Sequence, residues 1–383
     1  MYSRGMRGSV RKPRTSGGTW SYRLDLDVDA AGQRFQKQVG GFRTKKEAQT
    51  ALNEALSSVQ HGTYVAPSRQ TVAEFLALWI EGVKSELAIT AWSNYRMVVN
   101  FYIVPHLGSK RLTELTPVQI KAWHTKLLEH GRKDGTGLAS RSVQLAHRVL
   151  HRALADAVRW NLLMVNPASR VKAPKANSAE MQAWTAEEAV RFLGGVAETR
   201  LLALWIVALH TGLRRGELAG LRWKDIDVDG ATLTVAQQRT TADYAVVVMA
   251  PKAKSQRQLQ LAPTTIAALE AHRKRQRIER VAAGPAWENT GYVFVNELGQ
   301  PYHPSRLREM FEKDCIRVRV PAIRLHDLRH TMATLALQAG VHPKIVQEQL
   351  GHSAINVTLD IYSHVPQAVK REAAGKIAGI FEL

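Results

Sequence analysis

The residues of this chain with the clearest chemical potential lie between positions 210 and 365, in separate short stretches. One of them, "LHDLRHT" at residues 325–331, sets two histidines, an arginine and an aspartate within five consecutive positions. The others are "HTGLRRGEL" at residues 210–218, "PKAKSQR" at 251–257, "LGHS" at 350–353 and "LDIYSHV" at 359–365. Imidazole, guanidinium, ammonium and phenol groups together suit a phosphate ester as substrate.

Such a set of side chains could cleave a phosphodiester without a metal ion. Two arginines and neighbouring histidines can neutralise the oxygens of a pentacoordinate phosphorus, because charge-assisted and bidentate contacts suit phosphate. A tyrosine can attack the phosphorus and hold it covalently, and a lysine can protonate the departing sugar oxygen. The candidate residues are Arg214, Lys252 or Lys254, His326, Arg329, His352 and Tyr362.

Each stretch on its own also has an ordinary structural explanation. Arg214 and Glu217, three residues apart on one helix face, could form a surface ion pair. Lysines at a strand edge often only prevent edge pairing, and Tyr362 could be a half-buried aromatic residue. The whole series is far harder to obtain by accident, and it therefore favours the catalytic interpretation.

Helices are predicted to position most of these residues. Gly212 permits a tight entry into the helix that carries Arg214. An apolar stripe predicts a second helix, ended by Gly340, with His326, Arg329 and His330 on the side facing away from much of the core. The stripe consists of Leu328, Met332 and Leu335. A third helix begins at Pro343 and ends near Gly351, so that His352 belongs at a helix end.

The organisation of the rest of the chain predicts three domains. Residues 1–17 are basic and lack acids, and are expected to stay disordered until they meet phosphate; a solvated tail is the alternative. Alternating residues then predict strands near 19–29 and 33–42, followed by a helix near 44–59. Capping boxes at Thr71 and Thr185 begin two further units, separated by a linker at 172–182. The segment 226–261 is expected to be rich in strands.

One helix of the middle unit, within "SRSVQLAHRVLHRALADAVRW", shows apolar residues on one face and basic residues on the others. Arg141, Arg148 and Arg152 are the candidates for contacts with DNA phosphates; a merely solvated face is the alternative.

Composition supports a polyanionic partner. The 383 residues carry a net charge of +20, and nucleic acid is the leading candidate. An apolar run near 18 residues is missing, which argues against a membrane protein. The single cysteine, Cys315, excludes an internal disulfide and a thiolate metal cluster, and fits a cytoplasmic location.

The motifs "TGLRRGEL", "PKAKSQR", "HDLRHT", "LGHS" and "YSHV", in this order, resemble those of tyrosine recombinases of the phage-integrase type. The resemblance implies a multidomain α+β fold: a small three-stranded sheet plus helix that binds arm-type DNA sites (1–64), an all-α SAM-like core-binding domain (70–171), and a mainly α catalytic domain with a small antiparallel sheet (183–383).

The resemblance also implies roles for individual residues. Tyr362 would form a 3′-phosphotyrosyl link, Arg214 and Arg329 would clamp the phosphate, and Lys252 would protonate the 5′ oxygen. His326 would exchange the tyrosine proton, His352 would hydrogen-bond the phosphate, and Glu217 would support the site. Ala253 and Gln258 depart from the family pattern, which leaves Lys254 as an alternative to Lys252 and otherwise as a DNA contact. No cofactor or metal is implied.

The partners implied are double-stranded DNA with core and arm attachment sites, a homotetramer passing through a Holliday junction, and accessory proteins such as a directionality factor or a DNA-bending host protein. Three alternatives differ from an integrase. A non-catalytic repressor and a type IB topoisomerase-like enzyme both bind DNA, and a zinc hydrolase could use the i, i+4 pair His326 and His330.

Overall fold

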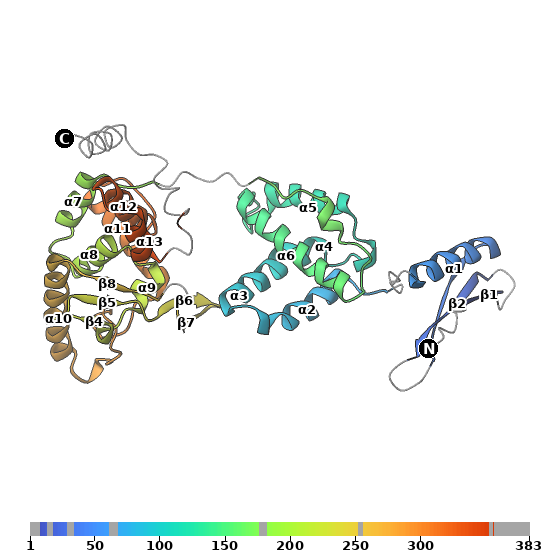
Figure 1. Cartoon of the computed structure of the whole chain (residues 1–383), viewed down its shortest axis with the longest axis horizontal. Coiled ribbons are helices and arrows are strands. Elements are labelled where there is room, and N and C mark those ends of the chain that lie inside the picture. Colours follow the sequence, from blue (N-terminus) through green and yellow to red (C-terminus); the bar gives the residue numbers. More distant parts are fainter. Residues whose placement is uncertain are drawn as a thin grey trace, which may run out of the picture. The chain divides into compact units, whose positions relative to one another are not determined.

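The structure is a computed structural model that describes residues 8–13, 18–28, 34–60, 68–175, 182–251, 256–351 and 355. The chain divides into two compact units, residues 1–178 and 179–383, each of which is described on its own (Figure 1). The small antiparallel sheets and the mainly helical remainder confirm the predicted fold class. Within the described residues, none of the helices combines the length and the apolar composition that a membrane span requires.

The chain starts with a small antiparallel sheet of order β1-β2-β3, covered by one helix. Its elements are β1 (Gly8–Arg11), β2 (Trp20–Val28), β3 (Arg34–Phe42) and α1 (Lys45–Gln60). Tyr22 and Leu24 of the sheet and Leu52 and Ala55 of the helix form the core between them. An amphipathic helix on one sheet face is the simplest way to bury both apolar surfaces.

The prediction of a disordered basic arm over residues 1–17 was wrong for residues 8–11. These residues pair with β2, Gly8 opposite Leu24 and Arg11 opposite Ser21. A Cβ on Gly8 would lie 2.4 Å from the Leu52 side chain, so α1 packs directly over this strand. Backbone pairing and this contact fix a segment that side-chain composition alone marks as unstructured.

The second part of the first unit is helical. Its α-helices are α2 (Val72–Gly82), α3 (Ile89–Val98), α4 (Val104–Leu107), α5 (Pro117–His130) and α6 (Ser140–Arg159), with short helical turns at Lys84–Glu86, Val99–Ile103, Leu112–Glu114 and Pro167–Arg170. The predicted capping box is present: the Thr71 N–H donates to Glu74 at 2.8 Å, and the Glu74 N–H donates to Thr71 at 3.2 Å. Inside the bundle the Trp79 indole donates to the buried carboxylate of Asp156 at 2.7 Å.

Helix α6 has the two faces that its sequence predicts. Val143, Leu150 and Leu154 are fully buried in the core of the bundle, whereas Arg141 and Arg148 are exposed. Arg152 is ion-paired with Glu86 at 3.2 Å. These three arginines and Arg159 follow each other at helical spacing along one stripe.

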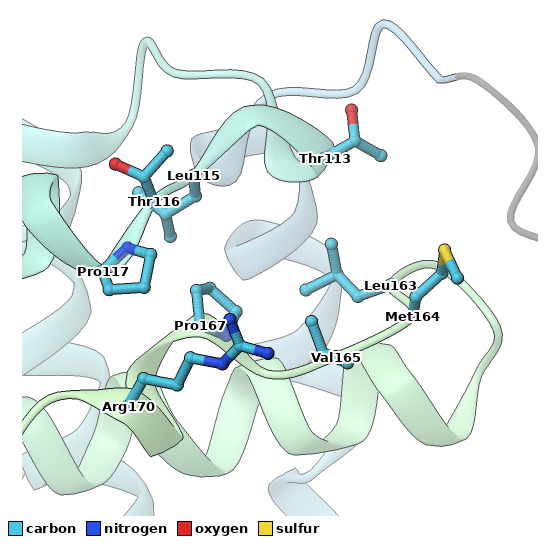
Figure 2. A pocket seen from close by; sticks show the side chains of 9 residues that line it. All are labelled: Thr113, Leu115, Thr116, Pro117, Leu163, Met164, Val165, Pro167 and Arg170. Carbon is cyan, nitrogen blue, oxygen red and sulfur yellow. The ribbon is translucent and has the colours of Figure 1, made fainter.

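A surface pocket of about 500 Å³ lies beside α5 in the same helical part. Figure 2 shows two segments facing each other across it, residues 113–117 on one side and 163–170 on the other. Most of its lining side chains are apolar, and Arg170 is the single charged one. None of the predicted catalytic residues belongs to this pocket.

The second unit combines helices with two small antiparallel sheets. Its helices are α7 (Ala186–Gly195), α8 (Leu202–Thr211), α9 (Arg215–Gly220), α10 (Pro263–Ala283), α11 (Pro304–Val318), α12 (Asp327–Gln338) and α13 (Pro343–Leu350), with short turns at Trp223–Asp225 and Gly284–Ala286. Its strands are β4 (Ile226–Asp227), β5 (Thr232–Thr234), β6 (Gln238–Ala242), β7 (Ala245–Met249) and β8 (Gln258–Gln260). All of these strands lie within residues 226–261, the segment that the sequence predicts to be rich in strands. One sheet has the order β4-β5-β8, and β6 and β7 form a separate hairpin.

The core of this unit is built from large aromatic side chains. Phe192, Trp205 and Phe311 contact each other with ring centroids 5.4–6.2 Å apart, and Trp184 packs against Phe192 and Phe311. The predicted capping box at Thr185 begins α7. This core holds α8, α11 and α12 together and thereby fixes the helix ends where the polar site forms.

Candidate active site

Arg214 is fixed at the start of α9. Gly212, with φ of +63°, ends α8 in the left-handed conformation, and the chain turns directly into α9. Glu217 accepts the backbone N–H of Arg214 at 2.9 Å and the Arg214 guanidinium at 2.8 Å. The predicted pairing of Arg214 with Glu217 is therefore present, and it both caps the helix and orients the arginine.

Glu217 is a buried carboxylate shared by two arginines. Its side chain is 2% exposed, and Arg257 binds both of its oxygens, at 3.2 and 2.9 Å. Burial alone would raise the pKa of Glu217, but the bonds from Arg257 and Arg214 outweigh it and hold that pKa below its usual value. Glu217 is thus ionised at neutral pH and partly balances the positive charge of the site.

Arg329 is buried, although the sequence places it on the side of α12 that faces away from much of the core. It is 3% exposed, and it donates to the carbonyl of Gly212 at 2.8 Å and to that of Leu350 at 2.5 Å. The ends of α8 and α13 supply these acceptors, which only the tertiary structure brings there. Burial, followed by the charge of Arg214, lowers the pKa of Arg329 to about 9, so that it stays protonated at neutral pH.

Three successive carbonyls at the end of α13 each receive one arginine. Gln349 accepts from Arg257 at 2.6 Å, Leu350 from Arg329 at 2.5 Å, and Gly351 from Arg214 at 3.0 Å. The last carbonyls of a helix lack partners within the helix and carry the negative end of its dipole. This helix end therefore gathers three guanidinium groups directly before His352 in the chain.

His326 and His330 contact each other edge to face, with ring centroids 5.4 Å apart. Burial, followed by the charges of His330 and Arg329, lowers the pKa of His326 to about 4. His326 is therefore neutral at pH 7 and can accept a proton. Asp327 has a bracing role, because it accepts two bonds from the Arg324 guanidinium at 2.9 and 2.8 Å.

The structure brings together Arg214, Glu217 and Arg329, and the charges of Arg214 and Arg329 act on His326. Four other predicted residues, Lys252, Lys254, His352 and Tyr362, lie outside the described residues. Among the residues that the structure does describe, no group of three or more metal-ligating side chains is placed to hold a metal ion.

Arg257 is the residue of this site that sequence reasoning missed. It closes the motif "PKAKSQR", in which only the lysines were assigned a role. Its position before the alternating residues of β8 resembles that of any strand-edge cation. The signal was a basic residue directly before a short strand of alternating residues, which becomes informative only when its buried partner Glu217 is known.

Comparison with known proteins extends along most of the chain. Residues 182–368 match the "Phage integrase family", residues 71–128 the "Phage integrase, N-terminal SAM-like domain", and residues 9–59 the "Arm DNA-binding domain". A "Tyrosine recombinase XerC-like" protein of Caldanaerobacter subterraneus subsp. tengcongensis is 30% identical, over 94% of this chain and 96% of that protein.

Two solved structures share the fold. The Tn1549 transposon integrase in complex with transposon right end DNA has a TM-score of 0.67 at 20% identity, covering 81% of this chain and 100% of that chain. A lambda integrase tetramer bound to a Holliday junction has a TM-score of 0.56 at 17% identity, covering 90% of this chain and 92% of that chain.

The three family matches run in chain order from the small sheet through the helical domain to the unit that carries the clustered arginines. The chain belongs to the phage integrase family of tyrosine recombinases, and it is a site-specific recombinase. The recognised resemblance is thereby confirmed, and neither the repressor nor the type IB topoisomerase-like alternative is favoured.

Gly212→Ala is expected to destabilise the catalytic unit by roughly 1–3 kcal/mol, because the left-handed backbone disfavours a Cβ and the site has no room for it. That Cβ would lie 2.5 Å from Met332 and 2.6 Å from Leu350. Denaturant unfolding measures the change. Gly194→Ala is the matched control, since a Cβ there meets nothing within 4 Å; equal stability of the two variants would contradict this account.

Protonation of His326 is expected to lower folding stability as the pH falls. The pKa of His326 is about 4 in the folded chain and about 6.5 in an unfolded one, so that between these values only the unfolded chain binds the proton. Stability is therefore lost as the pH falls through this window. Denaturant unfolding at pH 7 and pH 5 should show a smaller loss for His326→Gln than for the wild type, whereas identical losses would refute the assignment.

Proposed function

We propose that this recombinase cleaves and rejoins DNA through a covalent tyrosine intermediate, integrating a phage or another mobile element and in some settings excising it. Tyr362 attacks the phosphorus, a 3′-phosphotyrosyl bond forms, and the bond to the 5′ oxygen breaks. Lys252, with Lys254 as the alternative, gives a proton to that oxygen. The attack of the freed 5′-hydroxyl of a second strand reverses these steps and completes the exchange.

The observation that carries this proposal is the convergence of Arg214 and Arg329 on the end of α13. Both guanidinium groups are oriented by bonds to backbone carbonyls or to Glu217, which leaves their charge available to the non-bridging phosphate oxygens. His326, neutral at pH 7, takes the tyrosine proton. His352 follows Gly351 directly and hydrogen-bonds the same phosphate.

The proposed assembly follows the domain ranges predicted from the sequence. Residues 1–64 bind arm sites, residues 70–171 and 183–383 hold the core site, and residues 172–182 link them. Four protomers act on two duplexes through a Holliday junction, as the tetrameric lambda integrase complex with a shared fold suggests. A directionality factor or a DNA-bending protein is the proposed regulator, and the bacterial cytoplasm is the proposed location.

The test is covalent trapping of DNA by the wild-type protein in EDTA. Duplexes with a randomised core are first selected for tight binding, and a nick is then placed at successive positions near the expected cleavage point. Cleavage beside a nick releases a short fragment, religation fails, and a protein–DNA adduct should appear on a denaturing gel. Tight binding without an adduct at any nick position would favour the repressor instead.

Arg141 and Arg148 are proposed to contact DNA phosphates. Arg152, which is paired with Glu86, is proposed to add a further phosphate contact on the same stripe. Arg141→Gln or Arg148→Gln is expected to reduce the slope of log affinity against log salt by about 1, because one counterion fewer is released. Fluorescence anisotropy at several salt concentrations measures the slope. Arg111→Gln, an exposed arginine paired with Glu114, is the control, and a slope unchanged in all three variants would remove α6 from the interface.

A further inference from the structure

Arg257 connects segments of the catalytic unit that are far apart in the sequence. Its side chain is 7% exposed, and its Nε donates to the carbonyl of Gln349 at 2.6 Å. Nη1 and Nη2 donate to the two carboxylate oxygens of Glu217 at 3.2 and 2.9 Å. The Arg257 carbonyl accepts the N–H of Val235 at 2.9 Å, which fixes the backbone of Arg257 beside β5.

The other partners of Glu217 and of α13 give this connection a chemical consequence. Glu217 also binds Arg214, whose second terminal nitrogen reaches the carbonyl of Gly351. Arg257, Glu217, Arg214 and the last turn of α13 therefore form a closed ring of charge-assisted bonds. A shift of Glu217 or of the helix end would therefore move Arg214, which is bonded to both.

Direct contact of Arg257 with a phosphate does not fit its surroundings. All three nitrogens of its guanidinium are engaged by Glu217 and Gln349. Arg214 and Arg329, in contrast, form their bonds through the two terminal nitrogens. A guanidinium group that donates to both oxygens of one carboxylate is held rigidly. This geometry suits a side chain that holds Glu217 and the end of α13 in place.

We propose that Arg257 is a positioning residue of the recombinase site, which ties Glu217 to the end of α13 and so holds Arg214 in place for the reacting phosphate. This inference rests on the proposed phosphate-binding role of Arg214. It assigns Arg257 to stabilisation of the pentacoordinate phosphorus, and not to the protonation of the leaving oxygen.

The first measurement separates the rate of cleavage from DNA affinity. Arg257→Gln is expected to slow single-turnover adduct formation at saturating DNA by about 10- to 100-fold, as the loss of a supporting group around a reactive centre commonly does. The dissociation constant for the same duplex should stay within about twofold. Arg257→Lys retains the positive charge but not the planar guanidinium that donates to two oxygens at once, and it should recover only part of the rate.

Arg200→Gln provides a matched structural control in the same unit. Arg200 also binds both oxygens of a mostly buried glutamate, Glu279, at 2.7 and 2.6 Å, and it too bonds a backbone carbonyl. Arg200 takes no part in the bonds around Glu217. Its replacement should lower the unfolding midpoint while the folded protein cleaves at a rate near that of the wild type; equal slowing in both variants would overturn the proposal.

A second variant covers the case in which Arg257→Gln does not fold. The double variant Arg257→Gln/Glu217→Gln replaces both charges with amides and leaves no buried carboxylate unpaired. If Arg257 acts through Glu217, the double variant should be no slower than Glu217→Gln alone. If the fold-losses of the two single variants multiply in the double variant, Arg257 does not act through Glu217, and the proposal is contradicted.

A DNA substrate with sulfur in place of the 5′ bridging oxygen shows whether Arg257 supports protonation of the leaving group or stabilisation of the pentacoordinate phosphorus. A thiolate leaves without a proton donor, so this substrate should restore cleavage by Lys252→Ala but not by Arg257→Gln. Restoration of Arg257→Gln would show that it supports the lysine, and would overturn the assignment. Wild-type protein that forms no adduct on either substrate would instead mean that the proposed tyrosine chemistry fails, a result distinct from the failure of the Arg257 proposal.

Discussion

Tyr362→Phe is expected to abolish the covalent adduct, lowering its rate of formation by at least roughly 10⁴-fold, because phenylalanine has no oxygen to attack the phosphorus. DNA affinity should stay near that of the wild type, since most of the binding energy comes from many phosphate contacts elsewhere. The measurement is trapping on the nicked duplex, with anisotropy on the intact duplex as the binding assay.

Tyr244→Phe is the matched control for this variant. Tyr244 is 85% exposed in the turn between β6 and β7, so removal of its hydroxyl should leave cleavage unchanged. Adduct formation by Tyr362→Phe at an undiminished rate would mean that another side chain is the nucleophile. Loss of the adduct together with loss of DNA binding would point to misfolding of the site.

Arg329→Lys is expected to slow cleavage by about 10²–10³-fold at saturating DNA, the usual cost of losing one well-placed donor to a developing negative charge. Lysine keeps the positive charge but cannot donate at the same time to the Gly212 and Leu350 carbonyls and to a phosphate. The loss should appear in the single-turnover rate, because the charge develops only as the phosphorus becomes pentacoordinate.

Arg324→Lys controls for the general effect of this substitution near α12. Arg324 is 64% exposed and pairs with Asp327, outside the bonds that hold Arg329, so its replacement should change the rate by less than about threefold. If the two variants cleave equally fast, Arg329 does not stabilise the reacting phosphate. A large drop in unfolding stability for Arg329→Lys would have to be separated from the rate by measuring only folded protein.

The charge balance of the site explains why it suits a phosphodiester. Arg214 and Arg257 bind one ionised carboxylate, Glu217, and Arg329 adds a third positive charge at the same end of α13. The described part of the site therefore carries excess positive charge. The mutual repulsion contributes to the lowered pKa of Arg329, after burial. A bound phosphodiester would bring a negative charge to these groups and relieve that repulsion.

The sequence by itself determined the class of the protein and much of its local structure. The capping boxes at Thr71 and Thr185 and the pairing of Arg214 with Glu217 follow from residues three apart on one helix, which local spacing fixes. The order of the short motifs in the C-terminal half was enough to recognise the integrase family.

Only the tertiary structure decided how these motifs meet. Gly8–Arg11 became a strand because a partner strand and α1 were available to it, which a basic and glycine-containing segment does not reveal. Arg329 became buried because the ends of α8 and α13 offered carbonyls to it. Arg257 belongs to the site because it binds the buried carboxylate of Glu217, 40 residues earlier in the chain. Hydrogen bonds between residues distant in sequence depend on how helices pack, and local spacing carries no record of that packing.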